Sequence, residues 1–385
     1  MKNMGIYIHI PFCAKKCKYC DFVSFDDLND LVKDYCNALI KEIDNIVDEL
    51  KENAELDDIK IDTIYIGGGT PSIIPETEIE KILNRIKSEF NIIQNVEITI
   101  EVNPGTASKE KLERYYNIGI NRLSIGLQST NNSLLKMLGR VHNYKQFEEV
   151  FDISRKIGFN NINVDLMIGL PNQKLEDVEE SVLNIMGKNP EHISVYSLIV
   201  EENTQMYDMV YKGELILPDE ELERKMYWKV KELLEQNGYY QYEISNFSKK
   251  GYESKHNVNC WNQCEYIGFG VSAHSYIEKN RTSNIENIKT YINNCLNGDY
   301  MQNVILHEHQ SSSDMMKEYM LLGLRKIEGV NIQKFKEKFI KNPIYLFKDE
   351  LNRLYNMELI EIEDNFIKLT NKGIDLANIV WEEFV

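Results

Sequence analysis

The first 240 residues alternate between short apolar runs and longer segments with a helical period. The apolar runs are rich in Ile and Val and lie at residues 5–10, 63–66, 96–102, 122–127, 162–168 and 193–198. Strands that are buried on both faces have this composition, because helices cover them on each side. Six such runs, each followed by a helical pattern, predict an α/β fold with a parallel sheet.

One of the intervening segments shows the helical period most clearly. Its apolar stripe consists of Leu28, Leu31, Tyr35, Leu39, Ile43, Ile46 and Leu50. This spacing predicts a helix that packs against the sheet along one side. A further helix is predicted over residues 220–236, and Gly238 is well placed to end it. The β/α units can curl into a partial barrel or form an open doubly wound sheet, and periodicity does not choose between them.

The second half of the chain has a different pattern. Residues 239–284 are rich in Gly, Asn and aromatic residues and are expected to be irregular. From residue 311 the pattern predicts helices and one hairpin, whose turn is Asp364-Asn365. Helices with a small hairpin indicate a winged-helix-like α+β domain. We therefore expect three parts: a barrel at 1–238, an extension at 239–310 and a C-terminal domain at 311–385.

Composition and charge exclude several classes of protein. The chain has 385 residues and a formal net charge of −17, so it repels phosphate backbones and anionic lipid. Residues 311–385 carry 11 basic and 13 acidic residues, which is not the basic footprint of a duplex-binding winged helix. No apolar run approaches the roughly 18 residues that span a bilayer. The apolar run at the start of the chain is too short for the core of a signal peptide, so we expect a cytoplasmic protein. Because of its negative charge, we expect it to bind no nucleic acid.

Three of the seven cysteines, Cys13, Cys17 and Cys20, lie within eight residues directly after the first predicted strand. Clustered cysteines in a reducing compartment indicate a metal site. A structural zinc ion needs four ligands, so His9 or a distant cysteine would have to complete the set. Three thiolates on a short loop also suit a cubane iron–sulfur cluster with one open iron.

The other cysteines and histidines carry weaker signals. Cys36 and Cys295 lie in apolar helical patterns and are expected to be small core residues. His192, His307 and His309 are expected at the surface.

The segment around the cysteines, YIHIPFCAKKCKYCDF at residues 7–22, resembles the signature of the radical S-adenosylmethionine (SAM) superfamily. More narrowly, it resembles the oxygen-independent coproporphyrinogen III oxidase-like family, and the resemblance covers nearly the whole chain. It implies a partial parallel (β/α)6 barrel similar to a TIM barrel, followed by the winged-helix-like domain.

The resemblance also implies cofactors and their ligands. Cys13, Cys17 and Cys20 would hold three irons of a 4Fe–4S cluster, and SAM would chelate the fourth iron. An electron from the cluster would cleave SAM to methionine and a 5′-deoxyadenosyl radical. The residues that the family motifs place around SAM are Tyr7, Gly68, Gly69, Thr70, Glu101, Gln128, Arg140 and Asp165.

Two features favour the heme-chaperone branch of this family. The oxidases carry a fourth cysteine two places after the third, where this chain has Phe22. The segment KHNVNCW at residues 255–261 resembles a His-Asn element of the chaperone branch. By this resemblance His256 is expected to ligate heme iron, and Cys260, which stands where tyrosine is usual, is a second option. Imidazole and thiolate are both axial ligands of heme iron.

The function implied is a heme chaperone that binds a 4Fe–4S cluster, SAM and heme and transfers heme to respiratory acceptor proteins. Such a protein is capable in principle of SAM cleavage and lacks oxidase activity. An electron donor is a further expected partner, and membrane contact is expected only at the periphery, through partners. The alternative is oxidative decarboxylation of coproporphyrinogen III in porphyrin biosynthesis. Methyl transfer and heme breakdown, as in other relatives, have no residue here that argues for them.

Overall fold

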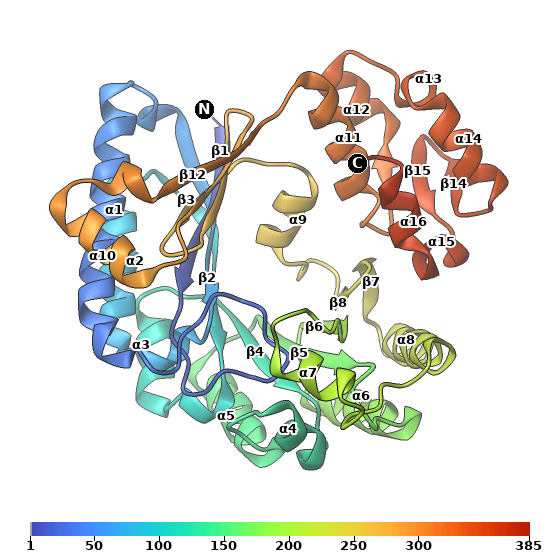
Figure 1. Ribbon diagram of the computed structural model, residues 1–385, viewed down its shortest axis with the longest axis horizontal. Helices are drawn as coiled ribbons and strands as arrows, with labels where there is room; N and C mark the ends of the chain where they lie inside the picture. Colours follow the sequence, from blue (N-terminus) through green and yellow to red (C-terminus); the bar gives the residue numbers. More distant parts are fainter. Residues whose placement is uncertain (1) are drawn as a thin grey trace.

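The computed structural model describes residues 2–385 and contains a large sheet and a small one (Figure 1). Six strands of the large sheet pair in parallel in sequence order. They are β1 (Lys2–Ile10), β2 (Ile59–Gly68), β3 (Ile92–Val102), β4 (Arg122–Gln128), β5 (Ile162–Ile168) and β6 (His192–Ser197). The predicted strands and the partial barrel are therefore confirmed, with strand ends that differ by a few residues.

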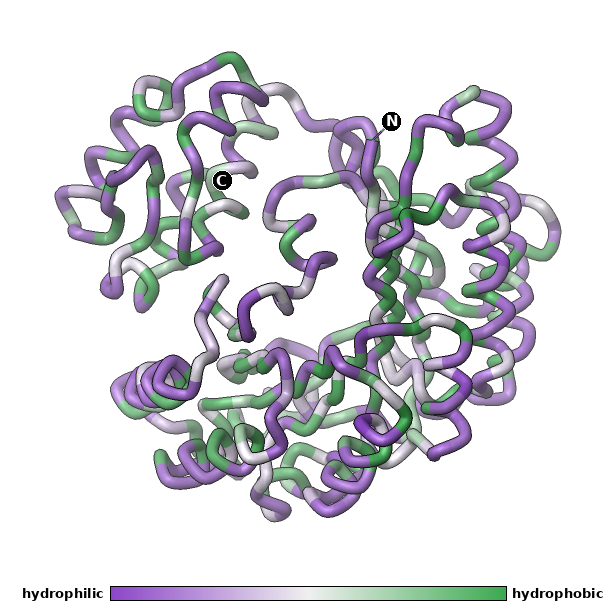
Figure 2. Tube along the Cα trace, turned by 180° about the vertical axis from the view of Figure 1, so that it is seen from behind, coloured by the Kyte–Doolittle hydropathy of each residue, from purple (hydrophilic) through white to green (hydrophobic). Residues whose placement is uncertain are grey.

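Helices follow these strands, and most of them cover the outside of the curved sheet (Figure 1). They are α1 (Val32–Glu52), α2 (Glu76–Glu89), α3 (Lys109–Asn117), α4 (Asn132–Leu138), α5 (Tyr144–Ile157), α6 (Leu175–Lys188), α7 (Gln205–Tyr211) and α8 (Glu220–Gln236). The last of these confirms the helix predicted over 220–236. Figure 2 shows hydrophobic residues concentrated along the strands and hydrophilic residues on the outer faces of the helices.

Alternation along each strand separates an apolar outer face from a polar inner face. On β1, Ile6, Ile8 and Ile10 are fully buried in the core, whereas Tyr7 and His9 contact one another on the opposite face. Each fully buried isoleucine contributes about 1.5–3 kcal/mol of burial energy. Because parallel strands end at one edge of a sheet, the inner side chains at their C-terminal ends gather at one mouth.

The segment 239–310 is more regular than its composition predicted. Its strands β7 (Tyr240–Glu243) and β8 (Asn246–Ser248) extend the sheet beyond β6. Beyond β1 the sheet continues with β9 (Tyr266–Phe269), β10 (His274–Ile277), β11 (Asn280–Asn284) and β12 (Val304–His309). The segment also contains the helices α9 (Lys255–Trp261) and α10 (Ile288–Asn297). The expectation of irregular structure was wrong, because such short strands leave little periodicity in the sequence.

The expected division of the chain at residues 238 and 310 stays a prediction. The large sheet runs across the first position, since β7 and β8 follow residue 238. After the second position lie α11 (Ser312–Gly323), β13 (Val330–Asn331), α12 (Ile332–Phe339), α13 (Pro343–Leu346), α14 (Lys348–Asn356), β14 (Ile360–Glu363), β15 (Phe366–Leu369), α15 (Asn371–Asp375) and α16 (Ala377–Glu382).

The predicted C-terminal hairpin is confirmed by the antiparallel pair β14 and β15. Both residues of its turn have positive φ, 48° at Asp364 and 70° at Asn365. Asp and Asn tolerate this region, which two-residue hairpin turns require. With β13 the hairpin forms the small three-stranded sheet of an α+β domain.

One end of the large sheet is tied to α1 by a buried carboxylate. Glu42 accepts hydrogen bonds from the Gly270 N–H at 2.8 Å, the Tyr291 hydroxyl at 2.6 Å and the Asn284 amide. Burial raises the pKa of Glu42 to about 7, although these hydrogen bonds oppose the shift. A single side chain therefore connects α1, the turn after β9, β11 and α10.

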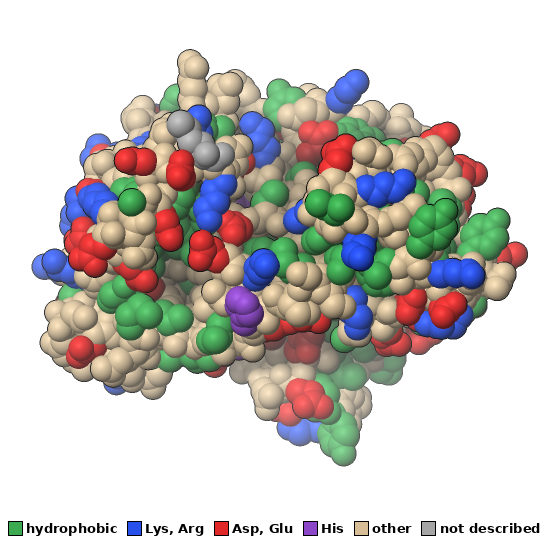
Figure 3. All heavy atoms as spheres, turned by 90° about the horizontal axis from the view of Figure 1, so that it is seen from above, with side chains coloured by type: hydrophobic (Ala, Val, Ile, Leu, Met, Phe, Trp, Pro, Cys, Tyr) green, Lys and Arg blue, Asp and Glu red, His purple; other side chains and the backbone are tan. Residues whose placement is uncertain are grey.

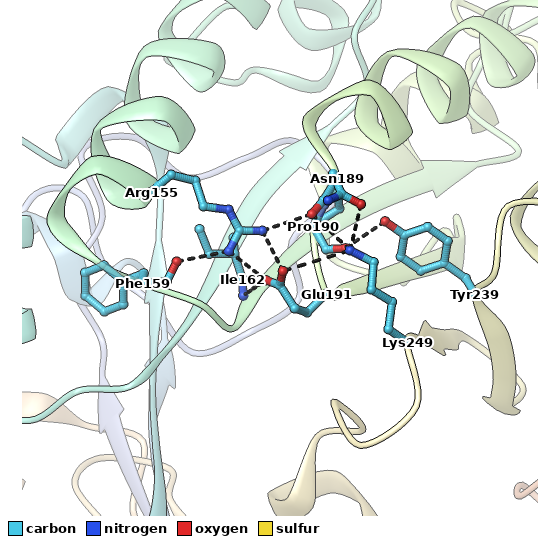
Figure 4. Close-up of polar contacts among 8 residues, drawn as sticks. All are labelled: Arg155, Phe159, Ile162, Asn189, Pro190, Glu191, Tyr239 and Lys249. Atoms are coloured by element: carbon cyan, nitrogen blue, oxygen red, sulfur yellow. Dashed lines mark hydrogen bonds and ion pairs between the residues drawn. The ribbon is translucent and has the colours of Figure 1, made fainter.

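An ion pair lies at the N-terminal ends of β5 and β6 (Figure 4). Arg155 of α5 lies 2.8 Å from the Glu191 carboxylate, which also accepts the Ile162 N–H at 3.1 Å. Lys249, after β8, donates to the Asn189 side-chain oxygen at 2.7 Å. These contacts hold the N-terminal ends of β5 and β6 against the segment that follows β8.

The surface carries charges of both signs. Acidic and basic side chains are interspersed on the face seen in Figure 3. Within residues 2–385, no helix has the length and apolar character needed to cross a bilayer.

We predict that Glu42→Ala lowers the free energy of unfolding by about 3 kcal/mol, because several buried donors lose their acceptor. Urea unfolding of the full chain at pH 7 measures this. Lys41→Ala, an exposed neighbour on the same helix, is the control and should change stability by no more than about 0.5 kcal/mol. Equal effects of the two substitutions would contradict the assignment.

Candidate functional site

The clustered cysteines lie on the loop that leaves the C-terminal end of β1, in dark blue in Figure 1. The Cys13 N–H donates to the Phe25 carbonyl at 2.8 Å, and the Cys20 N–H donates to the Cys17 carbonyl at 3.2 Å. The Lys18 N–H donates to the Leu138 carbonyl at 3.0 Å, and the Lys18 carbonyl accepts the Met206 N–H at 2.9 Å. Backbone hydrogen bonds within the loop and to neighbouring segments therefore fix the loop at the mouth of the barrel.

The three sulfurs lie close together, since charge on Cys17 acts on both Cys13 and Cys20. Burial, with a smaller contribution from Cys17 and Cys13, raises the pKa of Cys20 to about 11. Burial also raises the pKa of Cys13, against a hydrogen bond from the Thr70 hydroxyl at 3.7 Å. A thiolate is the form that binds metal, so a cationic group placed among these sulfurs would stabilise the ionised state.

A glycine turn at the end of β2 packs directly against this loop. A Cβ atom on Gly69 would lie 2.8 Å from the Phe12 carbonyl oxygen and 3.0 Å from the Cys13 sulfur. Gly68 has φ of +115°, and a Cβ there would lie 2.8 Å from the His9 ring. Only glycine permits this approach of two backbones. The N–H groups of Gly69 and Thr70 donate to the Ile10 and Phe12 carbonyls at 2.9 Å and 2.8 Å, so the end of β2 is held directly against the cysteine loop.

His9 is not free to complete a zinc site. Its Nδ1 pairs with the Tyr7 hydroxyl at 2.9 Å and its Nε2 with the Val23 carbonyl at 2.9 Å, so both ring nitrogens are occupied. Within residues 2–385, no three side chains of His, Cys, Asp or Glu are grouped as a single metal ion requires. A cubane cluster is larger than one ion, so its cysteine ligands stand further apart than those of a zinc site.

Arg140 joins the cysteine loop to the inner face of the sheet. Its guanidinium donates to the Gly126 carbonyl at 2.6 Å and to the Cys17 sulfur at 3.5 Å. Its Nε is buried without a protein partner. A Cβ on Gly126 would lie 3.2 Å from the guanidinium, so glycine keeps this space open. A cation next to a cysteine sulfur stabilises negative charge at the site.

Two half-buried carboxyls lie deeper in the mouth, on β3 and β5. Glu101 accepts the Tyr65 hydroxyl at 2.9 Å and the Gly68 N–H at 3.2 Å. Asp165 accepts the Asn163 amide at 2.6 Å. Burial raises the pKa of both groups, and that of Glu101 reaches about 7, with a further contribution from Asp165. Two carboxyls that are costly to ionise in an open mouth are suited to a cationic or hydroxyl-bearing ligand.

Gln128 ends β4 in a strained conformation, with φ of +75°. Non-glycine residues in this region are uncommon and often mark functional sites. Tyr7, Thr70 and Arg140 line the same mouth through the contacts described above, so the structure brings the predicted SAM residues together at the C-terminal ends of β1 to β5.

Arg122, which the sequence analysis missed, lies at the start of β4 inside the barrel. It is 2% exposed, and its Nε has no protein partner. Its positive charge lowers the pKa of both Glu101 and Asp165, although burial outweighs that effect. A charged residue within an apolar strand pattern was the available signal, because burying an unpaired charge is costly unless it has a role.

His192 was expected at the surface, and this expectation was wrong. The side chain is fully buried, where Nδ1 pairs with Asn163 at 2.6 Å and Nε2 with the Tyr242 hydroxyl at 2.8 Å. Tyr242 in turn accepts the N–H of Ser254, which caps α9, at 3.3 Å. This chain of polar contacts connects Asp165 in the barrel with α9. His307 and His309 lie on the exposed strand β12, as expected.

His256 lies at the opposite end of the barrel from the cysteines. Its Nδ1 is 2.9 Å from the Thr63 hydroxyl, and its backbone N–H donates to Glu97 at 3.1 Å. Glu97 precedes Glu101 by four residues, which corresponds to about 13 Å along β3. The His256 side chain is 7% exposed, and burial lowers its pKa to about 4. Burial also raises the pKa of Cys260, on the same helix, to about 12.

Comparison with known proteins gives consistent results along the whole chain. The sequence profile described as the radical SAM superfamily matches residues 7–185, and that of the HemN C-terminal domain matches residues 310–376. The chain is 40% identical over 380 residues to the heme chaperone HemW of Bacillus subtilis, with 98% of each chain covered. It is 35% identical over 384 residues to the heme chaperone HemW of Lactococcus lactis, covering all of this chain and 98% of that one.

A solved structure shows the same fold. The coproporphyrinogen III oxidase HemN of Escherichia coli, a radical SAM enzyme, superposes with a TM-score of 0.85. The match covers 100% of this chain and 90% of that one at 21% sequence identity. At this identity the likeness establishes the architecture of barrel and C-terminal domain.

We predict a pH dependence of stability that originates at Glu101, whose pKa is raised from 4.5 to about 7. Between these values the unfolded chain releases the proton and the folded chain keeps it. The free energy of unfolding should therefore fall as the pH rises from 5 to 7, by up to about 3 kcal/mol.

Glu101→Gln should remove this contribution. Urea unfolding at pH 5, 6 and 7 should show the wild type losing stability relative to the variant. Glu149→Gln, at an exposed position with the same chemistry, should run parallel to the wild type. If the free energy of unfolding of Glu101→Gln varied with pH as that of the wild type does, the prediction would be refuted.

Proposed function

Because this chain belongs to the radical SAM superfamily and, within it, to the HemW family, we propose that it is a heme chaperone. It binds a 4Fe–4S cluster, SAM and heme, and it transfers heme to acceptor proteins. The match covers 98% of the length of each of two relatives with this name.

The observation that carries the proposal is the arrangement at the mouth of the barrel. The Cys13 sulfur there lies against a glycine turn, Arg140 contacts the Cys17 sulfur, and two half-buried carboxyls lie below. Cys13, Cys17 and Cys20 would hold the cluster, which when bound supplies the electron for cleavage of SAM. Gly68, Gly69 and Thr70 would contact SAM through the end of β2, and Glu101 and Asp165 through their carboxyls. Tyr7, Gln128 and Arg140 complete this set.

The competing function is that of the oxidase, which has the same fold. Phe22 argues against it, since the oxidases have a cysteine there and this side chain is 60% exposed on the cysteine loop. An exposed phenylalanine contributes an apolar contact surface but no ligand for iron. In this proposal the chain therefore carries the cofactor site but has no coproporphyrinogen oxidase activity.

The proposal extends to partners and location. The heme acceptors are proteins of the respiratory type, and a separate electron donor reduces the cluster. The protein acts in the cytoplasm and reaches the membrane only through those partners. His256 and Cys260 stay predicted heme ligands from the sequence motif.

The deciding experiment offers heme and coproporphyrinogen III in parallel to anaerobically reconstituted protein with SAM and a reductant. We expect stable heme binding, passage of heme to an apo-acceptor, and no protoporphyrinogen. Absorption spectra of the separated proteins and chromatography of the porphyrins measure these results. Protoporphyrinogen formed over many turnovers, without heme binding, would replace the chaperone by the oxidase.

A further prediction concerns the cluster itself. Cys17→Ala should abolish cluster assembly, because two sulfurs cannot replace three as ligands. Iron and acid-labile sulfide content after anaerobic reconstitution measures the loss. Cys36→Ala is the matched control, since Cys36 is a buried residue of α1 and not of the cysteine loop, and it should leave the cluster content unchanged. Unaltered iron and sulfide in Cys17→Ala would refute the assignment.

A further inference from the structure

The proposed function requires an imidazole that heme iron can reach. An axial ligand needs a nitrogen lone pair that is both free and open to the ligand. In the described conformation the His256 ring is enclosed, because it is 7% exposed and packs against the Tyr65 ring, with the two ring centroids 5.2 Å apart. Its backbone is fixed as well, through the N–H bond to Glu97 at 3.1 Å. Exposure of His256 requires α9 to leave the barrel.

His274, the first residue of β10, has the opposite surroundings. The side chain is exposed. Across residues 2–385 its ring takes part in no hydrogen bond, and its one ring contact is with His307. The two imidazoles are stacked, with centroids 5.5 Å apart and an angle of 19° between their planes. Both nitrogens of His274 are therefore available while the ring orientation is set by a neighbour.

His307 is itself held in place. Its Nε2 is 2.7 Å from the Ser283 hydroxyl of β11. Ser283 pairs directly with both His274 and Ile305, so these side chains share one face of the sheet. Ile305 is 43% exposed and supplies an apolar surface beside the imidazoles. The arrangement combines a fixed nitrogen ligand with a hydrophobic neighbour, which suits a porphyrin.

The same face continues onto the inner face of β1. Tyr276 shares it with His274, two residues earlier, and pairs with Tyr266, which pairs with Gly5 on β1. His274 also affects the ionisation of His9, the inner residue near the end of β1. Partial burial and the neighbouring His307 lower the pKa of His274 below its ordinary value, which favours the neutral imidazole. Neutral imidazole is the form that binds iron.

We propose that His274 is the axial ligand of heme iron and that His307 is a positioning residue, held by Ser283 on the inner face of β10 to β12. This assignment rests on the proposed function and gives it a site. Two stacked rings side by side lie on the same side of any heme that either one binds, so only one of them ligates the iron.

The test is titration of the full-length protein with ferric heme, followed by absorption and electron paramagnetic resonance spectra. His274→Ala should lose the histidine-ligated spectrum and bind heme at least about tenfold more weakly. His307→Ala should keep the spectrum with a smaller loss of affinity. Added imidazole should restore the wild-type spectrum to His274→Gly, because free imidazole fills the vacated ligand position. His309→Ala, on the same exposed strand, should behave as the wild type.

Two other results are distinguishable. If His274→Ala keeps the wild-type spectrum and affinity while His256→Ala loses them, the assignment of His274 is overturned and the chaperone function stands. If the wild type binds no heme, the proposed function fails and the assignment fails with it.

Discussion

The alternation of side chains along six parallel strands is the constraint on which the rest of the structure depends. One face of each strand is apolar and packs beneath the helices, which stabilises the barrel. The other face is then enclosed by the curved sheet and can hold groups that would be costly in an ordinary core. Arg122 is buried in this interior, and Glu101 and Asp165 are half-buried there. The free-energy cost of placing these charged groups in the interior is offset by the packing of the outer face and by the electrostatic attraction between Arg122 and the two carboxyls.

The two ends of the barrel serve different purposes as a result. At the C-terminal ends of the strands, glycines let the end of β2 pack closely against the short cysteine loop. At the other end, α9 closes the interior through the bonds of its N-terminus to Glu97 and of His256 to Thr63. The polar chain from Asp165 through Asn163, His192 and Tyr242 connects the two ends. Movement of α9 would therefore alter the surroundings of a carboxyl at the mouth.

The strands β9 to β12 enlarge the inner face on the side of β1. They are held against α1 by Glu42, whose bonds reach the turn after β9, β11 and α10. This attachment fixes the relative position of the cysteine loop and the stacked histidines. Cofactor site and proposed heme site thus belong to one continuous sheet, and neither needs a mobile domain to bring it near the other.

The sequence by itself determined the six parallel strands, the helix over residues 220–236, the C-terminal hairpin and the cysteine loop. These features depend on local periodicity, on turn residues and on ligand spacing, all of which are written along the chain. The short strands of 239–310 were not predictable, because three to six residues carry little periodicity and their pairing joins distant segments. Burial of His192 and Arg122 was equally hidden, since exposure depends on what packs against a residue. The accessibility of His274 and the enclosure of His256 were decided by tertiary structure alone, because a motif names a residue type and only packing decides whether its nitrogen is free.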